Sequence, residues 1–182
     1  SARCRGCDHL GLHPVLDLGQ MPPSDRILTR DQLQLAERKF PLDVGFCPQC
    51  SLVQILETVP PEFLFGDDYM YFSSFSQAWL DHCRKNALDL IERRRLGPTS
   101  LVVELASNDG YLLKNFVEKG VPVLGIDPAP RQAAAAEKIG VRTLNTFFTR
   151  ELAERLKSKA TCADVIIGID NSGCNGSESI MS

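Results

Sequence analysis

Apolar residues along this chain follow two different patterns, and the change between them divides the sequence. Up to about residue 60 the apolar stretches are short and are separated by polar runs and by proline pairs at 22–23 and 60–61. These stretches predict strands at 15–19, 40–46 and 52–56, and the polar run at 29–40 favours a short helix. This apolar surface is too small for an independent core, so the segment needs a cross-link such as a bound metal ion to stabilise it.

A helical period begins near residue 76 and continues to residue 96. Apolar side chains recur there at three- and four-residue spacing, namely at Trp79, Leu80, Cys83, Ala87, Leu90 and Ile91. One of the serines at 73, 74 and 76 is expected to cap this helix, and Gly97-Pro98 to end it. The arginines at 93–95 suit the negative end of a helix dipole.

From residue 100 onward, strand and helix patterns alternate. Apolar runs predict buried parallel strands at 100–106, 122–127, 141–145 and 163–168, and the segments between them predict helices at 108–120, 128–140 and 149–159. Such a succession of right-handed βαβ units indicates an α/β fold with the first half of a doubly wound, Rossmann-like sheet. Residues 169–182 are polar, lack periodicity and are expected to form an irregular tail.

Composition limits the classes of function. The chain has 182 residues, 43% of them hydrophobic and 24% charged, with a net charge of −3, so no basic surface for nucleic acid is expected. No apolar run is long enough to cross a membrane, and the first residues lack the apolar core of a secretory signal. Seven cysteines without such a signal argue against a disulfide framework and favour a cytoplasmic location.

Four of the cysteines form two CxxC pairs, Cys4 with Cys7 and Cys47 with Cys50. Two such turns supply the four thiolates of a closed tetrahedral zinc site, which is structural because no coordination position stays open. Redox pairs or unliganded thiols are the alternatives, but a redox CxxC belongs between a strand and a helix. His9 and His13 lie near the first pair and are alternative ligands.

The turn after the first strand of a doubly wound sheet meets the ligand. Here residues 106–111 contain one glycine, Gly110, which disfavours an NAD-dependent oxidoreductase and favours S-adenosylmethionine, a cofactor without phosphates. Glu104 suits the cationic end of that cofactor, amides at the following helix N-terminus suit its carboxylate, and Asp127 suits both ribose hydroxyls. The alternative is that Asn108 and Asp109 only cap that helix.

The segment 66–80 leads into the cofactor half of the chain. Tyr69 and Tyr71 alternate with other apolar residues, so both tyrosines are expected to point the same way, toward a bound polar substrate. The alternative is an ordinary hydrophobic linker. Cys83 is expected to be a core thiol, and His82 a residue at the helix edge.

The motifs CRGC, LDLGQMP, FPLDVGFCPQCSLVQ, VPPEFLF, DYMYFSSFS, VVELASNDGYLL and PVLGIDPA together resemble those of the sugar C-methyltransferases of deoxysugar biosynthesis. That resemblance implies zinc ligation by the four paired cysteines and contact of Tyr71 with the substrate or its oxyanion. It also implies a cofactor site, extended here to two neighbouring positions, formed by Glu104, Ala106, Asn108, Gly110, Asp127 and Pro128.

The chain departs from this family in two respects. Ala106 replaces the usual glycine, and the later segment with a Tyr-x-Glu-His pattern, whose histidine serves as general base, is absent together with the C-terminal domain. The sequence thus predicts a truncated C-methyltransferase for a nucleotide-linked keto-deoxysugar, inactive alone, with a small-molecule substrate and no nucleic-acid or membrane partner. A non-catalytic zinc-binding interaction module is the alternative. The sugar, the methylated carbon and the oligomeric state stay open.

The expected organisation has four parts. Residues 1–62 form the zinc-binding domain, 63–98 a linker with the long helix, 99–168 the partial cofactor domain and 169–182 the tail. The fold class is therefore α/β, with a small zinc-stapled N-terminal domain before the methyltransferase sheet.

Overall fold

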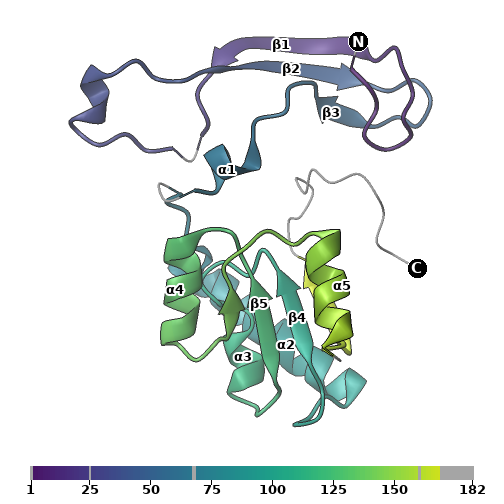
Figure 1. Ribbon diagram of the computed structural model, residues 1–182, viewed down its shortest axis with the longest axis vertical. Coiled ribbons are helices and arrows are strands. Elements are labelled where there is room, and N and C mark those ends of the chain that lie inside the picture. Colours follow the sequence, from purple (N-terminus) through teal and green to yellow (C-terminus); the bar gives the residue numbers. More distant parts are fainter. Residues whose placement is uncertain (1, 25, 67–68, 160, 169–182) are drawn as a thin grey trace. The chain divides into compact units, whose positions relative to one another are not determined.

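The computed structural model describes residues 2–24, 26–66, 69–159 and 161–168, shown in Figure 1. Their contacts separate a first unit, residues 1–64, from a second unit that begins at Phe65. Each unit is described by itself. The tail expected at 169–182 lies outside the described residues, and the four predicted domain limits remain predictions.

The first unit contains a three-stranded antiparallel sheet in the order β1-β2-β3. Its strands are β1 (His13–Met21), β2 (Phe40–Phe46) and β3 (Val53–Ile55), so the three predicted strands are present, with β1 longer than expected. A four-residue helix, α1 (Pro61–Leu64), follows. Every residue of β1 is exposed, which shows that this sheet does not cover a hydrophobic core along that strand.

The helix predicted at 29–40 is wrong. The structure has only a single 3₁₀ turn, η1 (Gln32–Gln34), after which the chain is extended into β2. Thr29 and Gln32 each accept the other's backbone amide, which begins a turn. Leu33 and Leu35 are 63% and 69% exposed, so no apolar face is buried that would extend the turn into a helix.

Burial in the first unit is concentrated at its cysteines. Among its described residues only Cys4, Gly45, Cys47 and Gln54 are buried. This agrees with the expectation that the segment lacks a core of its own, because apolar burial is what holds most domains of this size.

The second unit is built on a parallel sheet. Its strands are β4 (Val102–Leu105), β5 (Val123–Ile126), β6 (Thr143–Leu144) and β7 (Val165–Gly168), arranged β6-β5-β4-β7. The chain moves outward from β4 to β6 and then returns to place β7 on the other side of β4. The order therefore reverses at β4, as in a doubly wound sheet, which confirms the predicted fold class.

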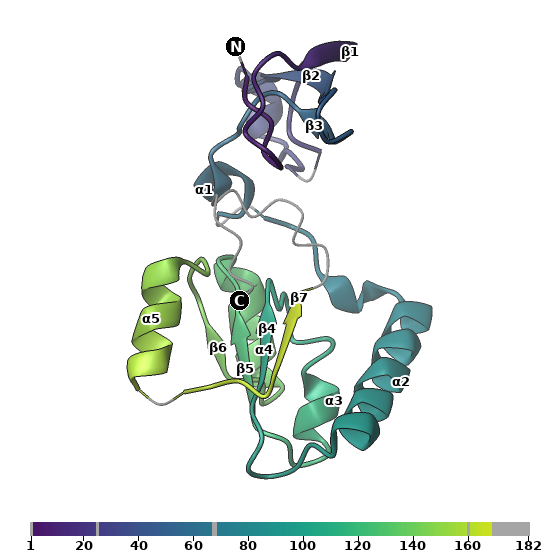
Figure 2. The same cartoon turned by 90° about the vertical axis from the view of Figure 1, so that its right-hand side faces the viewer.

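Helices cover both faces of this sheet (Figure 2). The helices are α2 (Gln77–Arg94), α3 (Lys114–Val117), α4 (Pro130–Lys138) and α5 (Arg150–Ser158). One hydrophobic cluster joins α2, α3 and α4 to one face through residues such as Cys83, Phe116 and Ala136. A smaller cluster packs Leu152 of α5 against the other face.

The long helix α2 is capped by a serine at its start and by an arginine, not a glycine, at its end. Ser76 is its N-cap, since its hydroxyl accepts the amide of Trp79. Its C-cap is Arg95, which has a left-handed φ of 53°. The helix therefore ends two residues before Gly97-Pro98, where the sequence predicted its end. Within the described part of the chain, no helix combines the length and the apolar character needed to cross a membrane.

The helix predicted at 108–120 is much shorter in the structure. Residues 106–113 form consecutive turns, and only Lys114–Val117 is helical. The reason lies in the backbone, because Ala106, Asn108 and Gly110 have left-handed φ angles that a right-handed helix does not contain. The helix therefore begins at Lys114 rather than directly after β4, and the binding of the cofactor carboxylate by amides near its N-terminus remains a prediction.

Candidate functional site

The two CxxC pairs fold into two turns of the same form. In each turn the backbone oxygen of the first cysteine accepts an amide from four residues later, Asp8 onto Cys4 and Ser51 onto Cys47, both at 2.9 Å. The donors have matching left-handed φ angles of 58° and 62°. Two turns of one geometry thus present two thiols each, although they lie forty residues apart in the sequence.

The four sulfur atoms of Cys4, Cys7, Cys47 and Cys50 lie within 4.8 Å of one another. Contacts cross between the pairs, with 3.5 Å from Cys4 Sγ to Cys50 Sγ and 3.6 Å from Cys7 Sγ to Cys47 Sγ. Four Zn–S bonds of ~2.3 Å in a tetrahedron require sulfur separations of ~3.8 Å. The cluster therefore fits zinc, and it contains neither His9 nor His13.

The thiols of this cluster differ in how readily they ionise. Burial opposes ionisation of Cys4, but the Gly6 amide and the neighbouring thiols lower its pKa to about 7. The pKa of Cys7 rises to about 12 although the His9 backbone lowers it, because desolvation and the other three thiols raise it. Four thiolates so close together are stable only with a cation among them, so metal binding must release protons.

Gln54, on β3, holds the first of these turns in place. Its Oε1 accepts the amide of Arg5 at 2.9 Å, and its Nε2 donates to the backbone oxygen of Arg3 at 3.1 Å. Gln54 was not among the predicted site residues. A polar side chain in a short, otherwise apolar strand beside the second pair was the available signal.

In the second unit, the loop after β4 has an unusual backbone. Left-handed φ angles occur at alternate positions, 55° at Ala106, 48° at Asn108 and 77° at Gly110. Only the third is glycine, although each non-glycine residue in this region costs ~1–2 kcal/mol. A Cβ at Gly110 would lie 3.1 Å from Val141 and 3.2 Å from Ala136, so close packing also requires glycine there. Strain of this kind gathers at functional sites.

Glu104 lies immediately before this loop and is completely buried. Neither of its carboxylate oxygens has a hydrogen-bond partner of good geometry. Burial holds the pKa of Glu104 well above its usual range; the nearby Tyr111 hydroxyl opposes that shift, and the charges of Asp127 and Asp109 add to it. An uncompensated buried carboxylate is costly, so its retention indicates a site that receives a positively charged partner.

Other buried polar atoms around the loop also lack partners. They are Ser107 Oγ, Asp109 Oδ1 and Gln132 Oε1, and with Glu104 they make up all such atoms found in the described residues. Native proteins leave few of these, so their concentration at one edge of the sheet marks a place for a polar ligand.

Asp127 directly follows β5 and connects two segments by its two oxygens. Oδ2 accepts the amide of Asn108 and Oδ1 accepts the amide of Ala129, both at 2.8 Å. Burial raises its pKa, these two amides lower it in part, and Asp109 raises it further. Glu104, Asp109 and Asp127 form no ion pair within the described residues, so no side-chain cation there offsets the charge of their ionised forms.

The side chains of Asn108 and Asp109 bind the segment that precedes α2. Asn108 Oδ1 accepts the amide of Ser73 at 3.0 Å, and Asp109 Oδ2 accepts both the amide and the hydroxyl of Ser74. The suggestion that the two side chains only cap a helix is therefore wrong. Residues 69–75, called the strap below, are attached to the cofactor loop by their backbone.

The remaining predicted residues lie around this site in different ways. Tyr71 belongs to the strap and is 53% exposed, Ala106 is exposed, and Pro128 directly follows Asp127. His82 stacks on Trp79 and hydrogen-bonds Asn86 at 2.9 Å, both on α2. Cys83 is a core thiol, as expected, and burial followed by the charge of Glu104 raises its pKa to about 11.

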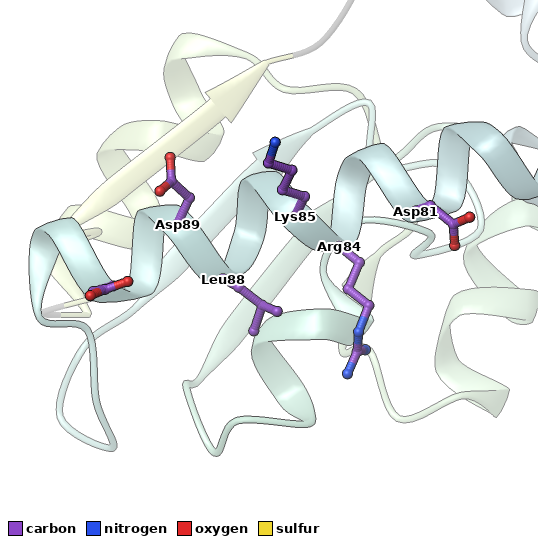
Figure 3. Close-up of a pocket in the computed structure, with 6 residues that line it drawn as sticks. Asp81, Arg84, Lys85, Leu88 and Asp89 are labelled. Atoms are coloured by element: carbon purple, nitrogen blue, oxygen red, sulfur yellow. The ribbon is translucent and has the colours of Figure 1, made fainter.

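A separate shallow depression runs along the exposed face of α2 (Figure 3). Arg84 reaches from it toward α3, where it pairs with Glu118 and contacts Asn115. Asp89 pairs with Arg93 on the same helix. The depression is thus a row of surface charges that pair locally, and it contains none of the predicted site residues.

Comparison with known proteins agrees with both sites. Residues 4–65 match a family described as "Putative zinc binding domain". Over 165 residues the chain is 34% identical to the C-methyltransferase NovU of Streptomyces niveus. This match covers 91% of this chain and 39% of NovU. The chain is thus similar to a C-methyltransferase and carries a match to a zinc-binding domain at its N-terminus. It spans about two fifths of NovU's length, so the activity of the whole protein is a matter for proposal.

These matches and the cysteine cluster support the predicted family, its structural zinc and its cofactor, S-adenosylmethionine. Among solved structures, a methyltransferase that depends on this cofactor, from Thermotoga maritima, is 24% identical, covers 39% of this chain and 33% of that one, and has a TM-score of 0.28. YjhP from E. coli is 18% identical, covers 57% and 34%, and has the same TM-score. Scores this low carry no argument, and the fold rests on the sheet order.

Proposed function

We propose that this chain binds S-adenosylmethionine at the carboxyl edge of β4 and β5 and serves the C-methylation of a nucleotide-linked keto-deoxysugar. The observation that supports it most is Glu104, a completely buried carboxylate with no ion pair and no hydrogen bond of good geometry among the described residues; Asp109 and Asp127 beside it also form no ion pair there. The cofactor carries an ammonium and a sulfonium, so it is a ligand whose charge compensates these acids.

Each predicted residue has a distinct part in this proposal. The Glu104 carboxylate pairs with the ammonium, and Asp127 accepts the ribose hydroxyls with the lone pairs that the two amides leave free. The left-handed backbone at Ala106, Asn108 and Gly110 keeps the loop close to the ligand. Pro128 follows Asp127 and lines the same edge.

When bound, S-adenosylmethionine supplies a methyl group on a cationic sulfur, already activated for transfer. The acceptor carbon, next to a sugar ketone, must first lose a proton to a general base, and the enolate oxygen must be stabilised. Held by Glu104 and Asp127, the cofactor would supply its methyl group to the enolate carbon, and the electron pair of the C–S bond would stay on sulfur. Tyr71 is our proposed contact to the oxyanion, since it is exposed on the strap.

No residue among those described is positioned to act as the general base. Among the described residues, His82 is engaged with Asn86 and Trp79 on α2, Asp109 accepts hydrogen bonds from Ser74, and Glu104 and Asp127 are assigned to the cofactor. We therefore propose that residues 1–182 alone turn over negligibly, since a positioned base contributes typically ~10²–10⁴-fold to the rate.

Calorimetry of the zinc-loaded chain with S-adenosylmethionine tests the proposal. Binding is expected, and Asp127→Ala should weaken it tenfold or more, because hydrogen bonds to a charged group contribute ~1.5–3 kcal/mol each. Lys138→Ala, an exposed position on α4, is the matched control and should bind as the unchanged chain does. No binding by a folded chain would instead favour the non-catalytic zinc-binding interaction module.

A second assay tests the proposed inactivity. The chain is incubated with S-adenosylmethionine carrying a radiolabelled methyl group and with a panel of nucleotide-linked 4-keto-deoxysugars. Only trace carbon-bound label is expected. Multiple turnovers would contradict the proposal and place the base within this chain, with His82 and Tyr71 as the first positions to replace.

A further inference from the structure

The strap and the proposed cofactor site are connected twice through Asp127. On one side, Asp127 Oδ2 accepts the amide of Asn108, whose side chain donates to the backbone oxygen of Tyr71 at 3.3 Å. On the other side, Asp127 Oδ1 accepts the amide of Ala129, the N-cap of α4, and Gln132 lies in the first turn of that helix. Gln132 also reaches the backbone oxygen of Tyr71, at 2.9 Å. The five residues close a ring.

Gln132 is held in one orientation by what it contacts. Its side chain is completely buried, and its Nε2 donates to the backbone oxygens of both Tyr69 and Tyr71. Reversing the amide would place its oxygen against two other oxygens, so this orientation is fixed by chemistry. Its Oε1 is left without a partner, a cost that the molecule bears to keep both strap contacts.

We infer that Gln132 is a positioning residue that, together with Asn108, couples the cofactor site at Asp127 to the strap that presents Tyr71. The inference rests on the proposed function, since it requires S-adenosylmethionine to engage Asp127. A ligand on Asp127 restrains the Asn108 amide and the start of α4, and these are two of the supports of the strap, beside Asp109. By linkage, cofactor binding then docks the strap, and a docked strap tightens the cofactor.

The strap itself reports this coupling. The amides of Ser73 and Ser74 donate to Asn108 and Asp109, so their hydrogen exchange measures local opening of the strap directly. In the zinc-loaded chain, saturating S-adenosylmethionine should slow exchange in the peptide that covers residues 69–75. Calorimetry on the same sample records whether the cofactor binds.

Gln132→Met keeps the side-chain volume and removes both donated hydrogen bonds. Exchange in the strap should become roughly tenfold faster, and the cofactor should slow it much less than in the unchanged chain, although it still binds. Lys138→Ala, on the exposed side of the same helix, should behave as the unchanged chain does. If Gln132→Met fails to fold, Ser74→Ala removes one exposed hydroxyl that bonds Asp109 and should give a smaller change in the same direction.

The outcomes separate the two proposals. Undiminished slowing by the cofactor in Gln132→Met, or cofactor binding to the unchanged chain without any effect on the strap, overturns the role of Gln132. Absence of cofactor binding by the unchanged chain overturns the proposed function. A residue with only a structural role would alter basal exchange and leave the effect of the cofactor intact, so the reduction of that effect is the deciding result.

Discussion

The hydroxyl of Ser107 lies directly over the Cα of Gly125. A Cβ at Gly125 would come within 2.5 Å of Ser107 Oγ and 2.9 Å of Thr143 Oγ1. Ser107 is completely buried, so the loop after β4 reaches its position by packing onto a strand that has no side chain there. Gly125 is thus a contact site for the cofactor loop.

Replacing Gly125 with alanine should therefore displace the loop. We expect a loss of about 1–3 kcal/mol in the free energy of unfolding, the usual cost of overpacking, and weaker binding of S-adenosylmethionine. Gly97→Ala is the control, because nothing lies within 4 Å of a Cβ there. Urea titration and calorimetry compare the two variants. Equal stability of both would show that Ser107 moves aside without cost.

Ala106 offers a change in the opposite direction. Its φ of 55° is unfavourable for alanine and ordinary for glycine, so Ala106→Gly should raise the free energy of unfolding by about 0.5–1 kcal/mol after the entropy of the unfolded chain is counted. Ala134→Gly, at an exposed position in α4, should lower it by about 1 kcal/mol. Thermal unfolding of both variants measures the sign of each stability change. Destabilisation by Ala106→Gly would argue against a left-handed backbone conformation at this position.

Glu104 should stabilise ligand binding at the expense of the fold. Burial raises its pKa in the folded state above 4.5, so its favourable contribution is complete below pH 4.5 and is lost as pH rises through the raised value. Glu104→Gln should therefore increase stability by about 1–3 kcal/mol near neutral pH, with less gain in acid, and abolish cofactor binding. Denaturation at several pH values measures the difference, and a gain independent of pH would contradict it.

Zinc is the next prediction. We expect about one zinc ion per chain by mass spectrometry, and Cys47→Ser should unfold residues 1–64 while the second unit stays folded, because structural zinc contributes an apparent binding free energy of ~10–16 kcal/mol. Cys162→Ser is the control, since Cys162 is exposed and outside the cluster. Zinc affinity should also decrease as the pH is lowered, because the pKa of Cys7 is about 12 and its proton must leave before zinc binds. A folded, metal-free first unit would refute this prediction.

Periodicity was sufficient to predict the sheet of the second unit. Its four strands and the helices α2, α4 and α5 have apolar faces that repeat at the expected spacing, so burial and local preference agree. Periodicity failed at residues 108–113, where the residue types suit a helix and the left-handed backbone at Asn108 and Gly110 prevents one. It failed again at 29–40, where a turn forms but nothing buries its leucines.

The candidate site was predicted in part. The four cysteines were recognised from spacing, because ligand chemistry dictates that spacing, and they do form one cluster. Roles for Glu104, Asp127 and the loop residues remain predictions. Gln132, Gln54 and Gly125 were missed because their importance depends on partners far along the chain, and no local pattern marks a glutamine that binds backbone sixty residues away.

The scarcity of burial in the first unit links its survival to the supply of metal. Among its described residues, the buried ones are two ligands, Cys4 and Cys47, together with Gly45 and Gln54, so little other burial opposes unfolding once the ion is lost. Each tenfold fall in free zinc above the dissociation constant removes about 1.4 kcal/mol from the folded state. Proteases cleave transiently opened chains in proportion to their population. The lifetime of this protein in a cell should therefore follow the zinc concentration, even where its second unit remains intact.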